Sequence, residues 1–203
     1  MRLLIATTNL GKAREIHAEL LSAGITDLEL LTLRDFPGSP EVIEDQPTFG
    51  GNAMKKALHY AAHCQVPSLA DDSGLCVDAL QGAPGILSAR YAGEPCDDAA
   101  NNRKLLDALK DVPAEKRSAH FVCALALALP NKPMVVLSDY VAGGIAYQPR
   151  GENGFGYDPL FVLPDRGLTT AELTIEEKSR ISHRGKAVRR LARWMLENPI
   201  DNL

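Results

Sequence analysis

The stretch RLLIATTNLGKAREI, residues 2–16, decides the fold class of this chain. It opens with an apolar run typical of a buried strand and passes directly into a helix, which we expect over residues 11–23. Ile16, Leu20 and Ala23 recur there at helical spacing. Strand-like and helix-like segments alternate outward from this stretch, and their order predicts an α/β protein with a mixed sheet.

The other elements are assigned by the same periodicity. Strands are expected over residues 28–33, 66–74, 119–129 and 133–147, and helices over 52–64, 96–112 and 184–198. The strand at 66–74 is predicted to be short and to end in acids, and the two long strands to be antiparallel neighbours. No repeat or linker divides the sequence, which favours a single domain over residues 1–203.

The composition is that of an ordinary globular protein. Hydrophobic residues make up 45% of the 203 residues, charged residues make up 24%, and the net charge is -4. Such a charge gives no broad attraction to nucleic acid or a membrane surface, so any anion site must be local. The four cysteines include no CxxC pair, and the first apolar run is too short for a signal peptide. We expect a cytoplasmic protein with no nucleic-acid or membrane partner.

The turn at residues 7–12 has the chemistry of a phosphate site. A helix N-terminus offers unpaired backbone N–H groups and the positive end of the helix dipole, and Lys12 adds a full charge there. The turn is not a P-loop, because Ala6 and Ala13 replace the glycine and the hydroxyl residue of that motif. The alternative is that Thr8 or Asn9 merely caps the helix and Lys12 is solvated.

Two further segments carry polar groups at informative spacing. Asn52 and Lys56 are four residues apart, so they project from one face of their helix and can reach one ligand. Asp71 and Asp72 are adjacent carboxylates directly after an apolar strand, and such a pair needs a metal, a cation or a raised pKa. A solvated lysine and a hydrated Asx-turn are the respective alternatives.

Aromatic and basic groups gather towards the C-terminus. GFGYDP, residues 154–159, places two aromatic rings among glycines, where a ring can be offered to a planar base or packed into the core. Lys178, His183 and Arg184 surround the start of the last helix. Positive charge is unfavourable at a helix N-terminus, which indicates either a ligand or a solvated basic turn.

Six motifs occur in order between residue 6 and about residue 187: ATTNLGK, TFxxNAxxKA, ADDSGL, GAPGxxSARY, GxxGFGYDPxF and EKSxISHRGKA. Together they resemble the inosine/xanthosine triphosphate pyrophosphatase family. The resemblance implies an elongated mixed β-sheet with flanking helices, which form two lobes around a central substrate cleft, and a homodimer. It also implies Mg²⁺-dependent hydrolysis of ITP, dITP, XTP or dXTP to a nucleoside monophosphate and pyrophosphate, which would remove deaminated purines before their incorporation into DNA or RNA.

The resemblance also assigns roles to residues of this sequence. Asp72 corresponds to the proton acceptor, Lys12 and Lys56 to cations at the phosphates, and Asp72 with Glu44 to the metal site. The substrate-binding residues would be Thr7, Thr8, Asn9, Leu10, Gly11, Lys12, Asn52, Ser73, Phe155, Gly156, Tyr157, Asp158, Lys178, His183 and Arg184.

Base selection follows from hydrogen-bond polarity. Hypoxanthine and xanthine carry a 6-oxo group that accepts from donors such as His183 or Arg184, whereas adenine presents an amino donor there. One unmatched buried hydrogen bond costs about 1–3 kcal/mol. Several together would give about 10⁴-fold discrimination.

One position departs from the family pattern, and two other functions compete. Gly51 stands where the family commonly has an acid, so Glu44 or Asp45 would have to compensate in metal binding. The first alternative is a related Maf-type pyrophosphatase, of the septum-inhibition class, which acts on pyrimidine or modified nucleotides. The second is a nucleotide-binding regulator without catalysis. The SHR and GFGYD stretches disfavour the former, and the paired acids with both lysines disfavour the latter.

Overall fold

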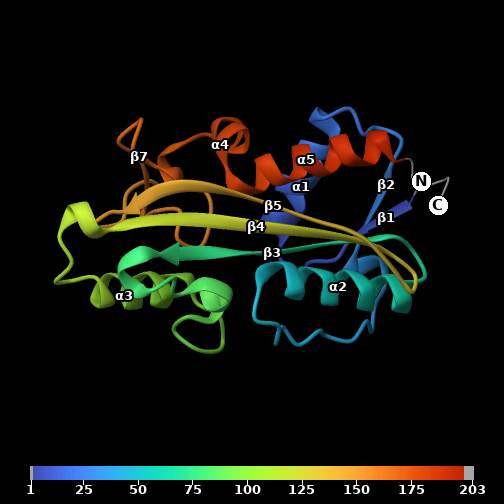
Figure 1. The fold of residues 1–203 in the computed structure, drawn as a ribbon, viewed down its shortest axis with the longest axis horizontal. Coiled ribbons are helices and arrows are strands. Elements are labelled where there is room, and N and C mark those ends of the chain that lie inside the picture. Colours follow the sequence, from blue (N-terminus) through green and yellow to red (C-terminus); the bar gives the residue numbers. More distant parts are fainter. Residues whose placement is uncertain (1, 199–203) are drawn as a thin grey trace. The chain divides into compact units, whose positions relative to one another are not determined.

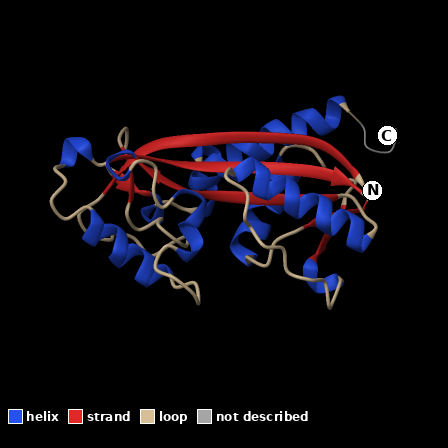
Figure 2. Cartoon of the chain, turned by 60° about the horizontal axis from the view of Figure 1, so that its bottom comes forward, coloured by secondary structure: helices blue, strands red, loops and turns tan. Residues whose placement is uncertain are grey.

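The structure, a computed structural model, describes residues 2–198 and confirms an α/β fold with one mixed seven-stranded sheet (Figures 1 and 2). The strand order is β2-β1-β3-β4-β5-β6-β7. The strands are β1 (Arg2–Ile5), β2 (Glu29–Thr32), β3 (Ser68–Val77), β4 (Ser118–Leu129), β5 (Lys132–Ile145), β6 (Phe161–Leu163) and β7 (Leu168–Thr169). The α-helices are α1 (Leu10–Ser22), α2 (Phe49–Cys64), α3 (Asp98–Ala108), α4 (Ile175–Ile181) and α5 (His183–Glu197).

The chain divides into two compact units. The first unit comprises residues 1–72, 123–139 and 184–203, and the second comprises 73–122 and 140–183. Strands β3, β4 and β5 each contribute residues to both units.

The first unit is built on parallel pairing. Strand β1 pairs in parallel with β2 and with β3, and its last pair with β3 joins Ile5 to Leu69. Alternate strand residues point to opposite faces. Leu3 and Leu69 therefore pack against α1 and α5 on one face, whereas Leu4 and Ala70 pack against α2 on the other. Figure 1 shows α1 and α5 on one side of these strands and α2 on the other.

The side chains under α2 are small. Ala53 and Ala57 of the helix pack with Ala124, Ala126 and Ala128 of β4, all of them buried. Alanines bring a helix backbone close to a sheet because little side-chain volume separates them. This close packing places the polar residues of the first turns of α2 beside β3.

The second unit has its own core around α3. Leu105 and Leu109 pack with Phe121, Tyr157 and Phe161, and all five are buried. Strand β6 pairs antiparallel with β5 and with β7. The helices and strands of this unit hold the segment that contains GFGYD.

The predicted elements differ from the structure at two places that bear on function. Strand β3 does not end at the acids but continues through them to Val77, because buried cations compensate one of the carboxylates. Helix α2 begins at Phe49, three residues before the predicted start, with Thr48 as its N-cap. The predicted neighbours β4 and β5 are adjacent and joined by two residues, a connection that requires antiparallel strands.

None of the helices within residues 2–198 is long and apolar enough to cross a membrane.

Candidate active site

Asp71 lies in a buried network of charges on the face of β3 that α1 and α5 cover. Its Oδ1 is 2.6 Å from Lys12 Nζ, and its Oδ2 is 3.0 Å from Arg184 Nε. Cys123 Sγ donates to the same Oδ2 at 3.1 Å, and Arg184 also pairs with Glu15. Burial alone would raise the pKa of Asp71, but Arg184 and Lys12 outweigh it and hold that pKa well below its ordinary value. Asp71 is therefore a charged anchor that joins β3 to α1 and α5.

Asp72 projects from the opposite face of the strand, towards α2. Lys56 Nζ lies 3.9 Å from its Oδ1, and Lys56 also pairs with Glu44. Burial raises the pKa of Asp72 to about 6, while Lys56 opposes the rise and Glu44 adds to it. Within residues 2–198, Oδ2 of Asp72 is buried and has no hydrogen-bond partner. A partly compensated carboxylate with a raised pKa is suited to accept a proton.

The turn at residues 7–12 caps α1, as one interpretation of the sequence predicted, but its lysine is not solvated. Asn9 caps α1, because its side chain accepts from the Lys12 amide at 3.0 Å, and Thr7 Oγ1 accepts from the Asn9 amide at 3.1 Å. The Lys12 side chain is only 18% exposed and contacts Asp71, so it is not a solvated surface charge. Its ammonium has three donors, and one contact leaves capacity for a phosphate oxygen.

Gly51 brings the segment before α2 close to the helix. A side-chain carbon at Gly51 would lie 2.9 Å from Cβ of Gln46, and the Gln46 amide donates to Asn52 Oδ1 at 2.9 Å. This docking places Glu44 against Lys56. The glycine that departs from the family pattern therefore permits the close approach of the segment that carries the second acid.

Glu44 and Asp72 are the oxygen donors placed to hold a divalent cation. Both contact Lys56, and the unpartnered Asp72 Oδ2 is available as a ligand. Across residues 2–198, no group of three or more histidine, cysteine or acidic side chains could enclose a metal ion. The donor set therefore fits an ion that takes a few carboxylates and completes its shell with phosphate oxygens and water. Asp45, the other acid considered, is engaged by Lys55 at 2.7 Å.

The second unit holds another buried ion pair, beside an aromatic ring. Lys178 Nζ is 2.6 Å from Asp158 Oδ2, which also accepts from the Phe155 amide at 2.9 Å. The same ammonium lies 4.8 Å from the centre of the Phe155 ring. Thr170 Oγ1 donates to Asp158 Oδ1 at 2.9 Å. Asp158 thereby fixes both the turn and the lysine.

The two aromatic residues of the turn have different environments. Tyr157 is 4% exposed, and its hydroxyl donates to the Ser88 carbonyl at 2.8 Å, so its ring belongs to the core. Phe155 is half-buried. Phe155 is therefore the ring of this turn that a planar ligand can stack on.

Two side chains of α3 bind the backbone of the GFGYD turn at Gly156. Asp98 Oδ2 accepts from the Gly156 amide at 2.7 Å, and Asn102 Nδ2 donates to the Gly156 carbonyl at 2.9 Å. Gly156 has φ of +62°, a conformation that favours glycine. Asp98 and Asn102 were not among the residues predicted from the sequence, although their spacing of four on one helix face was a usable signal.

The remaining predicted residues are distributed between the units. Buried His183 stacks on Phe121 in the second unit, with ring centres 4.8 Å apart and planes 13° apart. Ser73 directly follows Asp72 in β3. Arg184 is 2% exposed and directs its guanidinium to carboxylates of the first unit. The adjacent residues His183 and Arg184 therefore contact different groups. Glu15 and Cys123 complete that network and were not anticipated.

The arrangement of these groups is typical of one class of α/β protein. Lysines, carboxylates and a helix N-terminus gather just beyond the carboxyl end of a parallel strand, which is where α/β proteins of the phosphate-binding class hold their ligands. The Ham1 family model matches residues 3–194, and the chain belongs to that family.

Curated relatives and solved structures agree with this membership. The dITP/XTP pyrophosphatase of Geobacillus kaustophilus is 52% identical over 189 residues, which is 93% of this chain and 91% of the relative. The protein of the same name from Geobacter sulfurreducens is 52% identical over 92% of each chain. The solved HAM1 protein of Coxiella burnetii has a TM-score of 0.88 and 39% identity, and the match covers 97% of this chain and 99% of that protein.

Proposed function

We propose that this protein hydrolyses dITP, XTP and related non-canonical purine nucleoside triphosphates to a monophosphate and pyrophosphate. The relatives at about half identity are named for that reaction. The observation that carries the proposal is Asp72, a buried carboxylate with a raised pKa beside Lys56 and Glu44. A protein that only binds nucleotide has no need of such a base.

Asp72 is the general base in this proposal. It takes one proton from a water molecule as the water oxygen bonds to the α-phosphorus. The bond from the α-phosphorus to the oxygen that bridges to the β-phosphate breaks, and pyrophosphate leaves with that oxygen. Lys12 and Lys56 counter the charge of the phosphates, which is the main requirement of phosphoryl transfer.

Glu44 and Asp72 would hold the metal ion. Enzymes that cleave phosphoanhydrides generally use a divalent ion, which neutralises phosphate charge and lowers the pKa of bound water. We assign Mg²⁺, because two carboxylates completed by phosphate oxygens and water are its usual environment.

Base recognition is assigned to the second unit. Phe155 offers a ring for stacking, while Asp158 and Lys178 offer an acceptor and a donor beside it. His183 supplies a further ring nitrogen, and we keep Ser73 and Arg184 as predicted substrate contacts. A site that donates to a 6-oxo group disfavours adenine, because its donor would meet an amino group.

The test is pyrophosphate release, with and without EDTA, from dITP, ITP, XTP, GTP, ATP and CTP in parallel. We expect the 6-oxo non-canonical purines to be favoured and all turnover to depend on a divalent ion. Pyrimidine preference would instead support the Maf-type alternative. Nucleotide binding without pyrophosphate release would support the regulator.

Assembly and cellular location belong to the same proposal. We propose a homodimer in which each chain is one domain with two lobes, acting in the cytoplasm on free nucleotides. Sedimentation velocity of the purified chain tests the dimer: a monomer at micromolar concentration contradicts it.

A further inference from the structure

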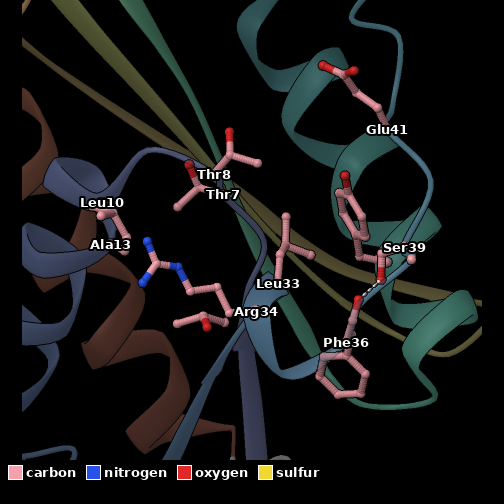
Figure 3. Close-up of a pocket in the computed structure, with 12 residues that line it drawn as sticks. Thr7, Thr8, Leu10, Ala13, Leu33, Arg34, Phe36, Ser39 and Glu41 are labelled. Atoms are coloured by element: carbon pink, nitrogen blue, oxygen red, sulfur yellow. Dashed lines mark hydrogen bonds between the residues drawn. The ribbon is translucent and has the colours of Figure 1, made fainter.

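A cavity of about 430 Å³ opens in the first unit beside the turn at residues 7–12. Thr7, Thr8 and Leu10 form one part of its wall, and Arg34, Phe36 and Tyr60 are among the residues that form the rest (Figure 3). Its volume is within the range of about 300–1,000 Å³ usual for small-molecule sites. Thr7, Thr8 and Leu10 are predicted substrate contacts, whereas Arg34 has no assigned role in the proposed reaction.

Arg34 is an exposed residue of the cavity wall, and no ion pair within residues 2–198 neutralises its charge. It lies in the short turn after β2, and its guanidinium points towards Leu10 and Ala13 at the start of α1 (Figure 3). No carboxylate within residues 2–198 forms an ion pair with it. The adjacent Asp35 is turned back on its own segment, where its Oδ2 accepts from the Thr32 amide at 2.7 Å. Glu41 is an acid of the cavity wall, and it lies on the far side from Arg34 (Figure 3).

The start of α1 completes an anion site opposite this guanidinium. Asn9 takes up the Lys12 amide, which leaves the earlier N–H groups of the first turn for a ligand. Thr7 and Thr8 add hydroxyl groups to the same wall. Guanidinium and hydroxyl donors in the wall of one cavity, beside a helix N-terminus, suit a phosphate group, because arginine binds phosphate through two parallel hydrogen bonds.

The lysines of the neighbouring site already contact carboxylates. Lys12 pairs with Asp71, and Lys56 pairs with Glu44 and lies 3.9 Å from Asp72 Oδ1. A nucleoside triphosphate brings about four negative charges. Arg34, in the wall of the cavity beside the turn, adds a positive charge outside these ion pairs.

We infer that Arg34 binds the β- and γ-phosphates of the substrate, which leave as pyrophosphate, in this cavity. The inference rests on the proposed function and extends it to a residue that none of the six motifs contains. Arg34 acts on the part of the substrate that becomes pyrophosphate and not on the monophosphate. Its removal must therefore separate the two products in their affinity for the enzyme.

The experiment compares Arg34→Gln, Arg34→Lys and the control Arg14→Gln in the full chain. Arg14 is an exposed arginine of α1 outside the cavity, so its substitution removes the same charge from the same unit. Inhibition of ITP hydrolysis by pyrophosphate and by the monophosphate IMP is measured for each, together with KM, kcat and the thermal midpoint.

For Arg34→Gln we expect about a tenfold rise in the pyrophosphate inhibition constant and in KM, which corresponds to about 1.4 kcal/mol. Inhibition by IMP should be unchanged, Arg34→Lys should restore part of the loss, and Arg14→Gln should match the wild type. Unchanged pyrophosphate inhibition, equal losses for both products, or the same loss in Arg14→Gln would overturn the inference.

Calorimetric titration of pyrophosphate with Mg²⁺ separates this inference from the proposed function. If the wild type releases no pyrophosphate from any nucleotide, the proposed function fails, but binding of pyrophosphate that is lost in Arg34→Gln still supports the anion site. Equal binding by both proteins overturns it.

Discussion

Asp71 and Asp72 are neighbours in one strand, yet the two faces of β3 give them opposite electrostatic environments. On the face covered by α1 and α5, Asp71 contacts both Lys12 and Arg184, and its pKa is held low. On the α2 face, Lys56 lies 3.9 Å from Asp72, and burial raises the pKa of Asp72 to about 6. The cations that reach each face therefore distinguish a charged anchor, Asp71, from Asp72, the acid that we propose as the base.

These different environments also explain how a folded strand tolerates two adjacent acids. A carboxylate held by two cations favours the folded state once it is ionised, whereas one that is buried with incomplete pairing disfavours it. The protein thus places a stabilising charge directly beside a destabilising one. Substitution at the two positions should move stability in opposite directions.

The largest expected effect is the loss of turnover in Asp72→Asn. Removal of a general base typically costs about 10²–10⁴-fold, and we expect kcat to fall by about 10³-fold. Binding of ITP should persist, because Lys12 and Lys56 remain. Single-turnover assays with equilibrium binding measure both quantities; turnover near the wild-type rate would remove Asp72 as the base.

Asp71→Asn should act on stability instead. It removes the carboxylate that pairs with buried Arg184 and with Lys12, and breaking such a buried pair costs about 3–5 kcal/mol. Urea denaturation at pH 7 measures this loss, with the exposed Asp45→Asn as control. If Asp71→Asn unfolded at the wild-type urea midpoint, the anchor role would be wrong.

The pH dependence of stability should distinguish the two acids further. A raised folded-state pKa means that, between about pH 4 and 6, the native protein binds more protons at Asp72 than the unfolded chain does, so this residue lowers stability as pH rises. The full cost above pH 6 is about 3 kcal/mol at most. Asp72→Asn should therefore be more stable than the wild type at pH 7.5 in EDTA, and the gain should vanish near pH 4.

The contribution of Asp71 to the pH dependence of stability has the opposite sign. Its lowered pKa gives stability that is fully present above its unfolded-state pKa and is lost as pH falls through the folded value. Urea midpoints from pH 3 to 8 test both signs. A pH-independent difference between wild type and Asp72→Asn would contradict the assigned environment.

Glu44→Gln tests whether Glu44 holds the metal ion. The substitution removes one of two carboxylates at Lys56, and we expect about a tenfold higher Mg²⁺ concentration for half-maximal activity. Saturating Mg²⁺ should recover most of kcat. Glu29→Gln, which changes an exposed acid of β2 in the same unit, is the control, and an equal shift in both variants would count against Glu44 as a ligand.

The smallest predicted effect lies in the second unit. Asn102→Ala removes the bond to the Gly156 carbonyl, and one such hydrogen bond is worth about 1 kcal/mol. We expect about a fivefold rise in KM for ITP with kcat little changed, and Asn102→Asp should not restore it because a carboxylate cannot donate. An effect on kcat alone would mean that Asn102 does not support base binding.

Much of the fold could be predicted from periodicity. The alternation of strands and helices gave the α/β class, and the large elements lie within a few residues of their predicted bounds. The continuation of β3 through its acids could not be predicted, because adjacent carboxylates normally end a strand and the compensating Arg184 is 113 residues away from Asp71. The short β6 and β7 carry too little pattern to be recognised.

The candidate site, like the fold, could be predicted only in part. From the sequence alone, the motifs identify Asp71, Asp72, both lysines, Phe155 and His183 as candidate residues, whereas Glu44 lies outside all six motifs. Their environments depend on the tertiary structure: Asp71 is held by two cations while Asp72 is buried with a raised pKa, Tyr157 is buried while Phe155 is half-buried, and Arg184 faces carboxylates. The physical reason is that residue identity fixes the available chemistry, whereas pKa and exposure depend on burial and on charges brought together from distant parts of the chain.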